Sequence, residues 1–239
     1  MIWWIAATLC AFYVKGLCGF ANTLVFTTVM SFGLSNRNIS PVELLLGYPS
    51  NAIIALKERR SIDPKLCLAL AALVVLGSIP GMLLLRDADT GFVKLVFGVV
   101  IVLLGAEMLL RERFAGKGKQ SGALLAVIGL LSGVLCGLYG VGALLGAYVS
   151  RVARDARAFR ANLCVVFFVE NTLRIILYSA MGLLNMGMLL QTARLFPVAL
   201  LGLFLGMKSG AYVSEKAVRR IVIVMLIVSG LSLVIGQLG

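Results

Sequence analysis

The sequence predicts an all-α integral membrane protein made of two homologous repeats of four segments each. The first observation is composition: hydrophobic residues make up 61% and charged residues 13% of the chain, whereas a soluble domain has about 45–50% apolar residues. The second is that long apolar runs recur along the whole chain and leave no stretch for a sizeable soluble domain. The third is a set of glycine and polar positions that recurs between the two halves.

Eight apolar segments follow one another between charged breaks, and most approach the ~20 residues that span a bilayer. The first has neither a basic leading region nor a small-residue cleavage site, so we expect it in the mature protein rather than in a signal peptide. The first and fifth segments are longer than the others, and glycines interrupt each of them. The segments cover about residues 2–34, 41–56, 65–85, 91–110, 122–149, 160–181, 188–207 and 217–236.

The two halves of the chain carry matching residues in the same order. Internal repeats of this kind are a mark of secondary transporter folds. We therefore predict a first repeat over residues 1–112, a cytoplasmic linker over 113–121 and a second repeat over 122–239. The matches are Gly16 with Gly137 and Gly19 with Gly140 at a shift of 121, Asn51 with Asn171 at 120, and Gly77 with Gly202 and Gly81 with Gly206 at 125.

The distribution of basic residues predicts the topology. Four loops, which follow the second, fourth, fifth and seventh segments, hold 16 of the 22 Lys and Arg residues. All four can face the cytoplasm, as the positive-inside rule requires, if the first and fifth segments enter the membrane and return. Each repeat then crosses three times, the repeats are inverted, and both termini lie outside. The alternative is eight full crossings, with a parallel repeat and one basic loop outside.

The re-entrant prediction agrees with the length of the two glycine-broken segments. Each has room for two half-helices of about 14 residues, which reach ~20 Å at 1.5 Å per residue. That length lets the two glycine boxes, residues 16–23 and 137–144, meet near the midplane of a ~30 Å hydrocarbon core. Backbone groups left open at this depth persist only where protein or a wet cavity satisfies them.

Glycines and polar residues in the two boxes are the first candidates for a substrate site. A half-helix that begins after a break directs N–H groups and a positive dipole end toward the membrane centre, which suits a small anion. The alternative is that the glycines only allow close helix packing. Lys15 either adds positive charge to the site or extends to an interface. The candidate substrate contacts in the boxes are Gly16, Gly19, Asn22, Thr23, Tyr139, Gly140 and Gly142.

The sixth segment carries ionisable residues at membrane depth, in the stretch "VENTLR". Glu170 and Arg174 are four residues apart on one helix face and are expected to pair. Arg174 and Asn171 are candidate substrate contacts, because a guanidinium binds two oxygens of an oxyanion at once. Glu170 would hold Arg174 in place or carry a proton, and the alternative is a purely structural ion pair. Asn51 is a further candidate, as the repeat counterpart of Asn171.

Composition also excludes several function classes. Histidine is absent and the five cysteines form no CxxC pair, so we expect no metal site, no cofactor, no disulfide framework and no enzyme. The net charge of +12 is attributed to cytoplasmic loops rather than to nucleic-acid binding. The expected partners are a small anionic substrate and the lipid bilayer, and a homodimer stays open.

The two boxes and the stretch "ARAFRANL" (156–163) resemble the TauE/SafE family of sulfite and organosulfonate exporters. The family's boxes are similar to G-x-x-G-F-G-G-G and G-L-x-G-V-G-G-P, where this chain has "GLCGFANT" and "GLYGVGAL". Ala21, Asn22 and Thr23 replace part of the first glycine run, and Ala143-Leu144 replaces Gly-Pro in the second. The resemblance implies a multi-pass inner-membrane transporter of small sulfur-containing or carboxylate anions, and it leaves the direction of transport open.

The expected function is therefore secondary transport of a small anion by alternating access at a midplane site. A sulfur-containing oxyanion or organosulfonate, such as sulfite or sulfoacetate, is the expected substrate. The alternatives are a passive anion channel and a permease for a carboxylate without sulfur.

Overall fold

The computed structural model describes residues 2–31, 36–87, 122–140, 142–210 and 212–214, with scattered positions within 95–109 and 217–235. The predicted linker and most of the fourth and eighth predicted segments lie outside the described residues. Within the described ranges all regular structure is helical, which confirms the predicted all-α class. The helices are α1 (Ile2–Cys18), α2 (Asn22–Ser31), α3 (Asn36–Lys57), the short 3-10 helix η1 (Arg59–Ser61), α4 (Pro64–Asp87), α6 (Gly122–Tyr139), α7 (Ala143–Val152), α8 (Ala156–Ala180) and α9 (Met186–Ser209).

Four of these helices are long and apolar enough to cross a membrane, over residues Ile39–Lys57, Pro64–Leu83, Ala156–Ala180 and Met186–Ser209. Large apolar side chains on their outer faces are exposed, among them Leu68, Leu76 and Leu83 along α4. Because residues seven or eight apart lie on one helix face, these leucines form an apolar stripe, which acyl chains would cover in a bilayer.

Both glycine boxes are breaks between two helices, as the sequence predicted. Gly19 and Gly140 adopt positive φ angles of 82° and 69°, which end α1 and α6. The equal half-helices of about 14 residues were wrong: α1 and α6 have 17 and 18 residues, and α2 and α7 have 10 each. The position of the positive-φ glycine decides where each helix ends, and it lies late in the segment. The first leg therefore reaches ~25 Å and the second ~15 Å.

The second segment also begins earlier than predicted. The predicted segment starts at about residue 41, yet α3 starts at Asn36 and includes both Pro41 and Pro49. Ser40, in this added turn, is buried and accepts a hydrogen bond from Arg174. This turn stays helical because Arg174, a buried partner, satisfies the side chain of Ser40. In a similar way, neighbouring helices satisfy the backbone groups that prolines free in spanning segments.

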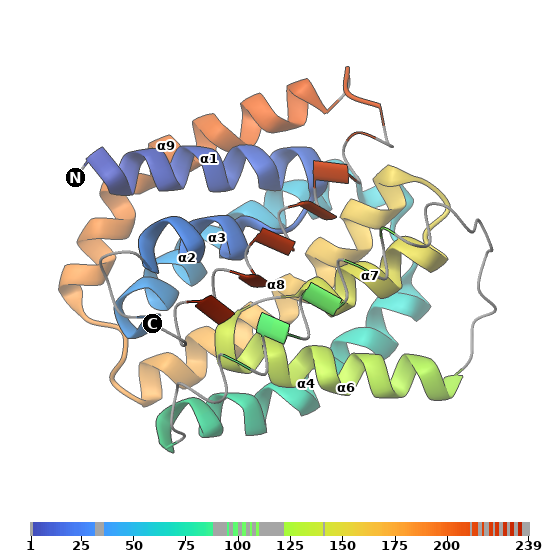
Figure 1. Ribbon diagram of the computed structural model, residues 1–239, viewed down its shortest axis with the longest axis horizontal. Helices are drawn as coiled ribbons and strands as arrows, with labels where there is room; N and C mark the ends of the chain where they lie inside the picture. The colour runs from blue at the N-terminus through green and yellow to red at the C-terminus, as the bar shows by residue number, and fades with distance from the viewer. Residues whose placement is uncertain are drawn as a thin grey trace.

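Two tight helix pairs flank a centre formed by α3 and α8 (Figure 1). In one pair, Gly16 of α1 lies against the carbonyl of Leu203 in α9, and Gly206 of α9 lies against the carbonyl of Tyr13. A side chain at either glycine would collide with backbone, so glycine is required for this approach. The close packing that the sequence offered as an alternative role therefore applies to Gly16.

The second pair, α4 with α6, uses corresponding positions. Gly137 of α6 lies against the carbonyl of Ser78 in α4, and Gly81 of α4 lies against the carbonyl of Val134. Gly137 and Val134 are 121 residues after Gly16 and Tyr13. Ser78 and Gly81 are 125 residues before Leu203 and Gly206. The two interfaces thus have matching contacts at the shifts that relate the sequence halves.

Candidate substrate site between the two helix breaks

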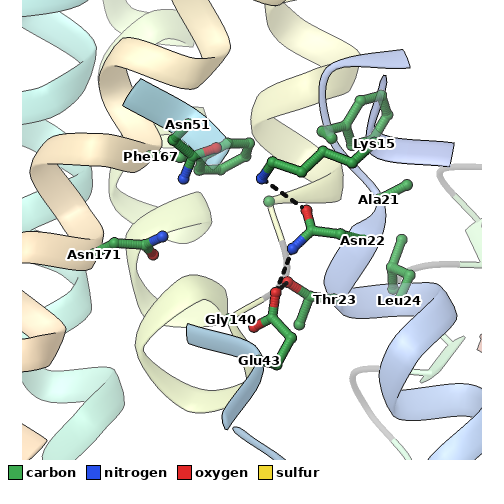
Figure 2. Close-up of a pocket in the computed structure, with 12 residues that line it drawn as sticks. Lys15, Ala21, Asn22, Thr23, Leu24, Glu43, Asn51, Gly140, Phe167 and Asn171 are labelled. Atoms are coloured by element: carbon green, nitrogen blue, oxygen red, sulfur yellow. Dashed lines mark hydrogen bonds between the residues drawn. The ribbon is translucent and has the colours of Figure 1, made fainter. Parts of the chain in front are cut away.

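A cavity lies between the two breaks and against the central helices α3 and α8 (Figure 2). It holds about 380 Å³ of space not filled by atoms, part of it open to solvent. The wall combines a cation, a carboxylate, three side-chain amides and two glycines of the second break. The lining residues are Lys15, Phe20, Ala21, Asn22, Thr23, Leu24, Glu43, Asn51, Gly140, Gly142, Phe167 and Asn171.

Lys15 extends its ammonium group into this cavity from the last turn of α1. The side chain is 1% exposed, and Nζ donates a hydrogen bond of 3.0 Å to Oδ1 of Asn22. A cation is favoured at this place because the carbonyl end of a helix dipole is negative. Of the two sequence interpretations of Lys15, burial of the side chain excludes extension to an interface and leaves the ammonium group at the cavity.

Glu43 of α3 holds the other end of the same chain of hydrogen bonds. Nδ2 of Asn22 donates to Oε1 of Glu43, and Oγ1 of Thr23 donates to the same oxygen at 2.8 Å. The amide of Asn22 therefore lies between a buried ammonium and a buried carboxylate, and its two ends match the two charges (Figure 2). Asn22 and Thr23 also tie the start of α2 to α3, which fixes the orientation of the break.

Asn51 and Asn171 bring the two halves of the sequence together at the cavity, from α3 and α8. Asn171 lies across the cavity from Asn22 (Figure 2). Oδ1 of Asn51 is buried, and within the described part of the chain it has no hydrogen-bond partner. A buried polar atom without a partner is unfavourable by about 1–3 kcal/mol. Because Oδ1 is an acceptor, a hydrogen-bond donor in the cavity would satisfy it, and an oxygen of an anion would not.

The second break supplies a smooth backbone wall. At Gly142 an added Cβ would overlap the ring of Phe167, and at Gly140 it would come within 2.6 Å of Nη1 of Arg174. Gly140 and Gly142 therefore face the cavity with backbone alone, and a side chain added at either would displace the side chain of Arg174 or Phe167. The aromatic ring of Phe167 closes the apolar side of the cavity.

Arg174 lies behind the second break rather than in the cavity wall. Nη2 donates to Oγ of Ser40 at 2.9 Å and to the hydroxyl of Tyr178 at 3.3 Å. Nε lies 3.8 Å from Oε1 of Glu170, which confirms the predicted pair across one helical turn. That separation is an ion pair without a hydrogen bond, and among the described residues neither atom has another hydrogen-bond partner.

The two breaks do not lie level with each other. Gly19 lies against the side chain of Arg160, near the start of α8, whereas Gly140 lies against Arg174. These two positions are about 21 Å apart along α8 at its usual rise. The sequence placed both boxes together at the midplane. In the structure, residues of both boxes line one cavity, although Gly19 and Gly140 contact different parts of α8.

Two further predicted contacts, Gly16 and Gly19, lie away from the cavity wall. Gly16 packs on α9, and Gly19 accepts a hydrogen bond at its carbonyl from Sγ of Cys164, 3.3 Å away. Tyr139 is the last residue of α6, and its side chain lies outside the described residues. The cavity thus unites Lys15, Asn22, Thr23, Asn51, Gly140, Gly142 and Asn171 from the predicted set.

The model of the family described as sulfite exporter TauE/SafE matches residues 4–233, nearly the whole chain. The chain belongs to the TauE/SafE family. The resemblance found in the glycine boxes is thereby confirmed, and with it a multi-pass membrane protein of an anion-exporter family, whose members are transporters rather than enzymes. Among curated proteins and among solved structures, no significant match to the chain is found.

One departure from the TauE/SafE box pattern has a structural consequence. Ala21 stands where the family pattern has glycine, and its φ of 72° makes it the one non-glycine residue with a positive φ among the described residues. The left-handed region is unfavourable for a residue with a Cβ by roughly 1–2 kcal/mol. Ala21 thus adopts a conformation that glycine, the residue in the family pattern, would adopt without this cost.

Sequence reasoning missed Glu43 and the Arg174 partners Ser40 and Tyr178. Glu43 is a single acid inside an apolar stretch, which was a sufficient signal, since ionisable residues in spanning segments are functional candidates. Starting the second segment at residue 41 placed Glu43 at a predicted end, where charge is ordinary. Both Ser40 and Tyr178 contact Arg174, and they contact each other although they are 138 positions apart in the sequence. No local pattern reveals these contacts.

Proposed function

We propose that this chain moves a small oxyanion across the membrane, with the cavity between the two breaks as its substrate site. A sulfur-containing oxyanion such as sulfite, or an organosulfonate such as sulfoacetate, is the substrate that family membership favours. The observation that carries the proposal is the convergence of Lys15, Asn51 and Asn171 with the bare backbone of the second break at one buried cavity. A cation and amide donors in a low-dielectric site are what an oxyanion needs to leave water.

The helix ends add to the attraction for an anion. α2 and α7 begin at the two breaks, and the start of a helix is the positive end of its dipole. Their positive dipole ends and the ammonium of Lys15 reinforce one another. Asn51 and Asn171 would bind substrate oxygens from opposite repeats.

Alternating access between inverted repeats is the mechanism that we propose for this site. The matching contacts of α1 with α9 and of α4 with α6 support two equivalent halves. In transporters built from inverted repeats, exchanging the conformations of the two halves turns an outward-facing site into an inward-facing one. The two breaks contact different parts of α8, and in that step each break would take up the surroundings that the other has now.

The basic end of the molecule would face the cytoplasm of a cell whose inner membrane holds the protein, with both termini outside. A small second cavity lies at this end, beside Gly16 and Lys57. Arg160, which also lines it, donates from Nη2 to Oε1 of Glu58 at 2.9 Å. Because Arg160 also covers the break at Gly19, this ion pair would close the cytoplasmic route to the substrate cavity.

The rival functions are a passive channel and a permease for a carboxylate without sulfur. Flux measurements on the purified protein in liposomes distinguish these functions from the proposed transporter. A transporter gives a saturating flux of labelled sulfite and counterflow against unlabelled sulfite, whereas a channel gives a flux without counterflow. Competition by sulfoacetate and by a dicarboxylate then ranks the substrates. A saturating flux of the dicarboxylate alone would replace the sulfur anion as the substrate.

A further inference from the structure

Four buried charged side chains lie around the cavity and the second break: Lys15, Glu43, Glu170 and Arg174. They are the buried charged residues of the described part of the chain. Two are cations and two are anions, so the empty site is balanced when all four are ionised. Charges removed from water are tolerated only when such balance and hydrogen bonds compensate for the lost hydration.

A bound anion disturbs this balance. A monoanion beside Lys15 leaves the cluster with one excess negative charge in a region where charges interact far more strongly than in water. Asn22 cannot offset that charge, because its amide is neutral. The excess is removed if one carboxylate of the cluster takes up a proton as the anion enters.

Glu43 is the carboxylate placed to take that proton. Both hydrogen bonds that it accepts, from Asn22 and Thr23, end on Oε1. Oε2 accepts no hydrogen bond from the residues that the structure describes, and Glu43 lines the cavity (Figure 2). A proton can therefore reach Oε2 through the cavity without breaking the contacts that hold α2 to α3.

The other charged groups around Glu43 are committed elsewhere. From α8, Glu170 pairs with Arg174 behind the break, away from the cavity wall. From α1, Lys15 is the single cation of the wall and is needed by the anion. The remaining elements present to Glu43 the uncharged side chains of Asn22 and Thr23 from α2 and the glycine backbone between α6 and α7.

We propose that Glu43 carries a proton that is transported together with the anion, so that the TauE/SafE chain is a proton-coupled anion transporter. This inference rests on the proposed function of the cavity. When the site is open to one side, an anion binds Lys15 and a proton from water binds Oε2 of Glu43. Both leave to water on the other side, and the carboxylate is restored. Lys15 stays protonated throughout, and no other bond is formed or broken.

Two rates measured in the same liposomes test this step, with the membrane potential clamped by potassium and valinomycin. The first is sulfite counterflow without a pH gradient. The second is net sulfite uptake driven by a gradient of about one pH unit, acid outside, after subtraction of protein-free liposomes. One proton per anion corresponds to about tenfold accumulation for each pH unit. Because the weak-acid chemistry of sulfite is the same in all vesicles, differences between variants report the protein.

The expected result separates two variants of Glu43. Glu43→Gln resembles the protonated acid, a state within the cycle, so it loses the gradient-driven accumulation by a much larger factor than it loses counterflow. Glu43→Asp keeps a carboxyl group and retains part of that accumulation. Asp155→Asn, at the exposed start of α8, is the matched acid-to-amide control and behaves as wild type, since Asn also caps a helix.

Each other outcome overturns the inference. Gradient-driven accumulation that persists in Glu43→Gln shows that the proton is carried elsewhere. Loss of counterflow by the same factor in Glu43→Gln makes the residue part of anion binding rather than of coupling. Equal losses in Glu43→Asp and Glu43→Gln assign it a geometric role. Wild-type counterflow without any response to the pH gradient rejects coupling and leaves the proposed function intact, whereas absence of wild-type sulfite flux rejects the function itself.

Discussion

The backbone of Gly140 lies directly against the guanidinium of Arg174. A Cβ at position 140 would come 2.6 Å from Nη1 and 3.0 Å from Nη2. The break of the second glycine box and the buried arginine of α8 therefore depend on each other: the arginine fills the space that a side chain would need. The same glycine needs its positive φ, so position 140 is constrained both by its backbone conformation and by its neighbour.

Substitution at Gly140 should be more harmful than backbone strain alone explains. Gly140→Ala places a methyl group in the left-handed region and against Arg174, whereas Gly182→Ala meets the same strain with no atom within 4 Å. We expect Gly182→Ala to destabilise by roughly 1–2 kcal/mol and Gly140→Ala to lower the melting temperature further and to reduce transport. Thermal unfolding in detergent measures the difference, and equal melting temperatures would remove Arg174 from the explanation.

Restoring glycine in the first box should stabilise the protein. Ala21→Gly relieves a φ of 72°, although glycine also loosens the unfolded chain by ~0.4–1 kcal/mol. With the left-handed penalty of roughly 1–2 kcal/mol, the net gain should be about 0.5–1 kcal/mol. Ala72→Gly, at an exposed position inside α4, should lose about 1 kcal/mol instead. A fall in melting temperature for both variants would contradict the strain at Ala21.

Removing Arg174 should impair transport much more than removing Arg154. Arg174→Ala leaves the buried carboxylate of Glu170 unpaired, at a cost of about 3–5 kcal/mol, and releases Ser40 and Tyr178. Arg154 is exposed before α8. Melting temperature and sulfite counterflow of both variants provide the comparison. Similar melting temperatures and counterflow rates for the two variants would show that Arg174 and its partners do not hold the break at Gly140 in place.

The proposed topology predicts one-sided access to the loop before α8. In a cysteine-free background that still transports, Arg154→Cys should react with a membrane-impermeant maleimide only after the cytoplasmic face is opened. Reaction in intact cells would place this basic loop outside, and it would favour eight full crossings over re-entrant first and fifth segments.

The parts of the account that sequence could predict are those with a local signal. The breaks at Gly19 and Gly140 follow from glycines interrupting apolar runs, and the pairing of Glu170 with Arg174 follows from their spacing. The depth of the breaks did not follow, because it depends on which glycine adopts a positive φ. Glu43 had a local signal, as an acid in an apolar stretch, but it was missed because the predicted segment started at residue 41. Its partners, Asn22 and Thr23, are about 20 residues away and are identified only by the fold.

Arg174 illustrates the limit most clearly. Its charge and depth predicted a direct substrate contact, and its fork of donors suits an oxyanion. In the structure, Ser40, Tyr178 and the backbone of Gly140 surround this fork. Side-chain chemistry therefore predicted a substrate contact, whereas tertiary packing directs the donors of Arg174 to the protein. Lys15, for which the sequence left two interpretations, is the cation that reaches the cavity.

Gly47 is the position at which a substitution tests most directly whether this cavity binds the transported anion. It lies one turn after Glu43 on α3, and a Cβ there would be 3.4 Å from Nδ2 of Asn22 and 3.9 Å from Nδ2 of Asn171. These are ordinary contact distances, so Gly47→Ala adds a methyl group between the cavity amides without moving the backbone. Inside a helix the change to alanine should itself be neutral or stabilising, by up to about 1 kcal/mol.

The decisive measurement is the rise in melting temperature caused by sulfite, in wild type, Gly47→Ala and Gly187→Ala, the last a control at the start of α9. Binding to the native state raises the melting temperature by mass action. The account predicts that sulfite stabilises wild type and Gly187→Ala alike, and that Gly47→Ala, equally stable without ligand, needs about tenfold more sulfite for the same rise, or ~1.4 kcal/mol of lost affinity. An unchanged sulfite response in Gly47→Ala would contradict the account and place the anion elsewhere.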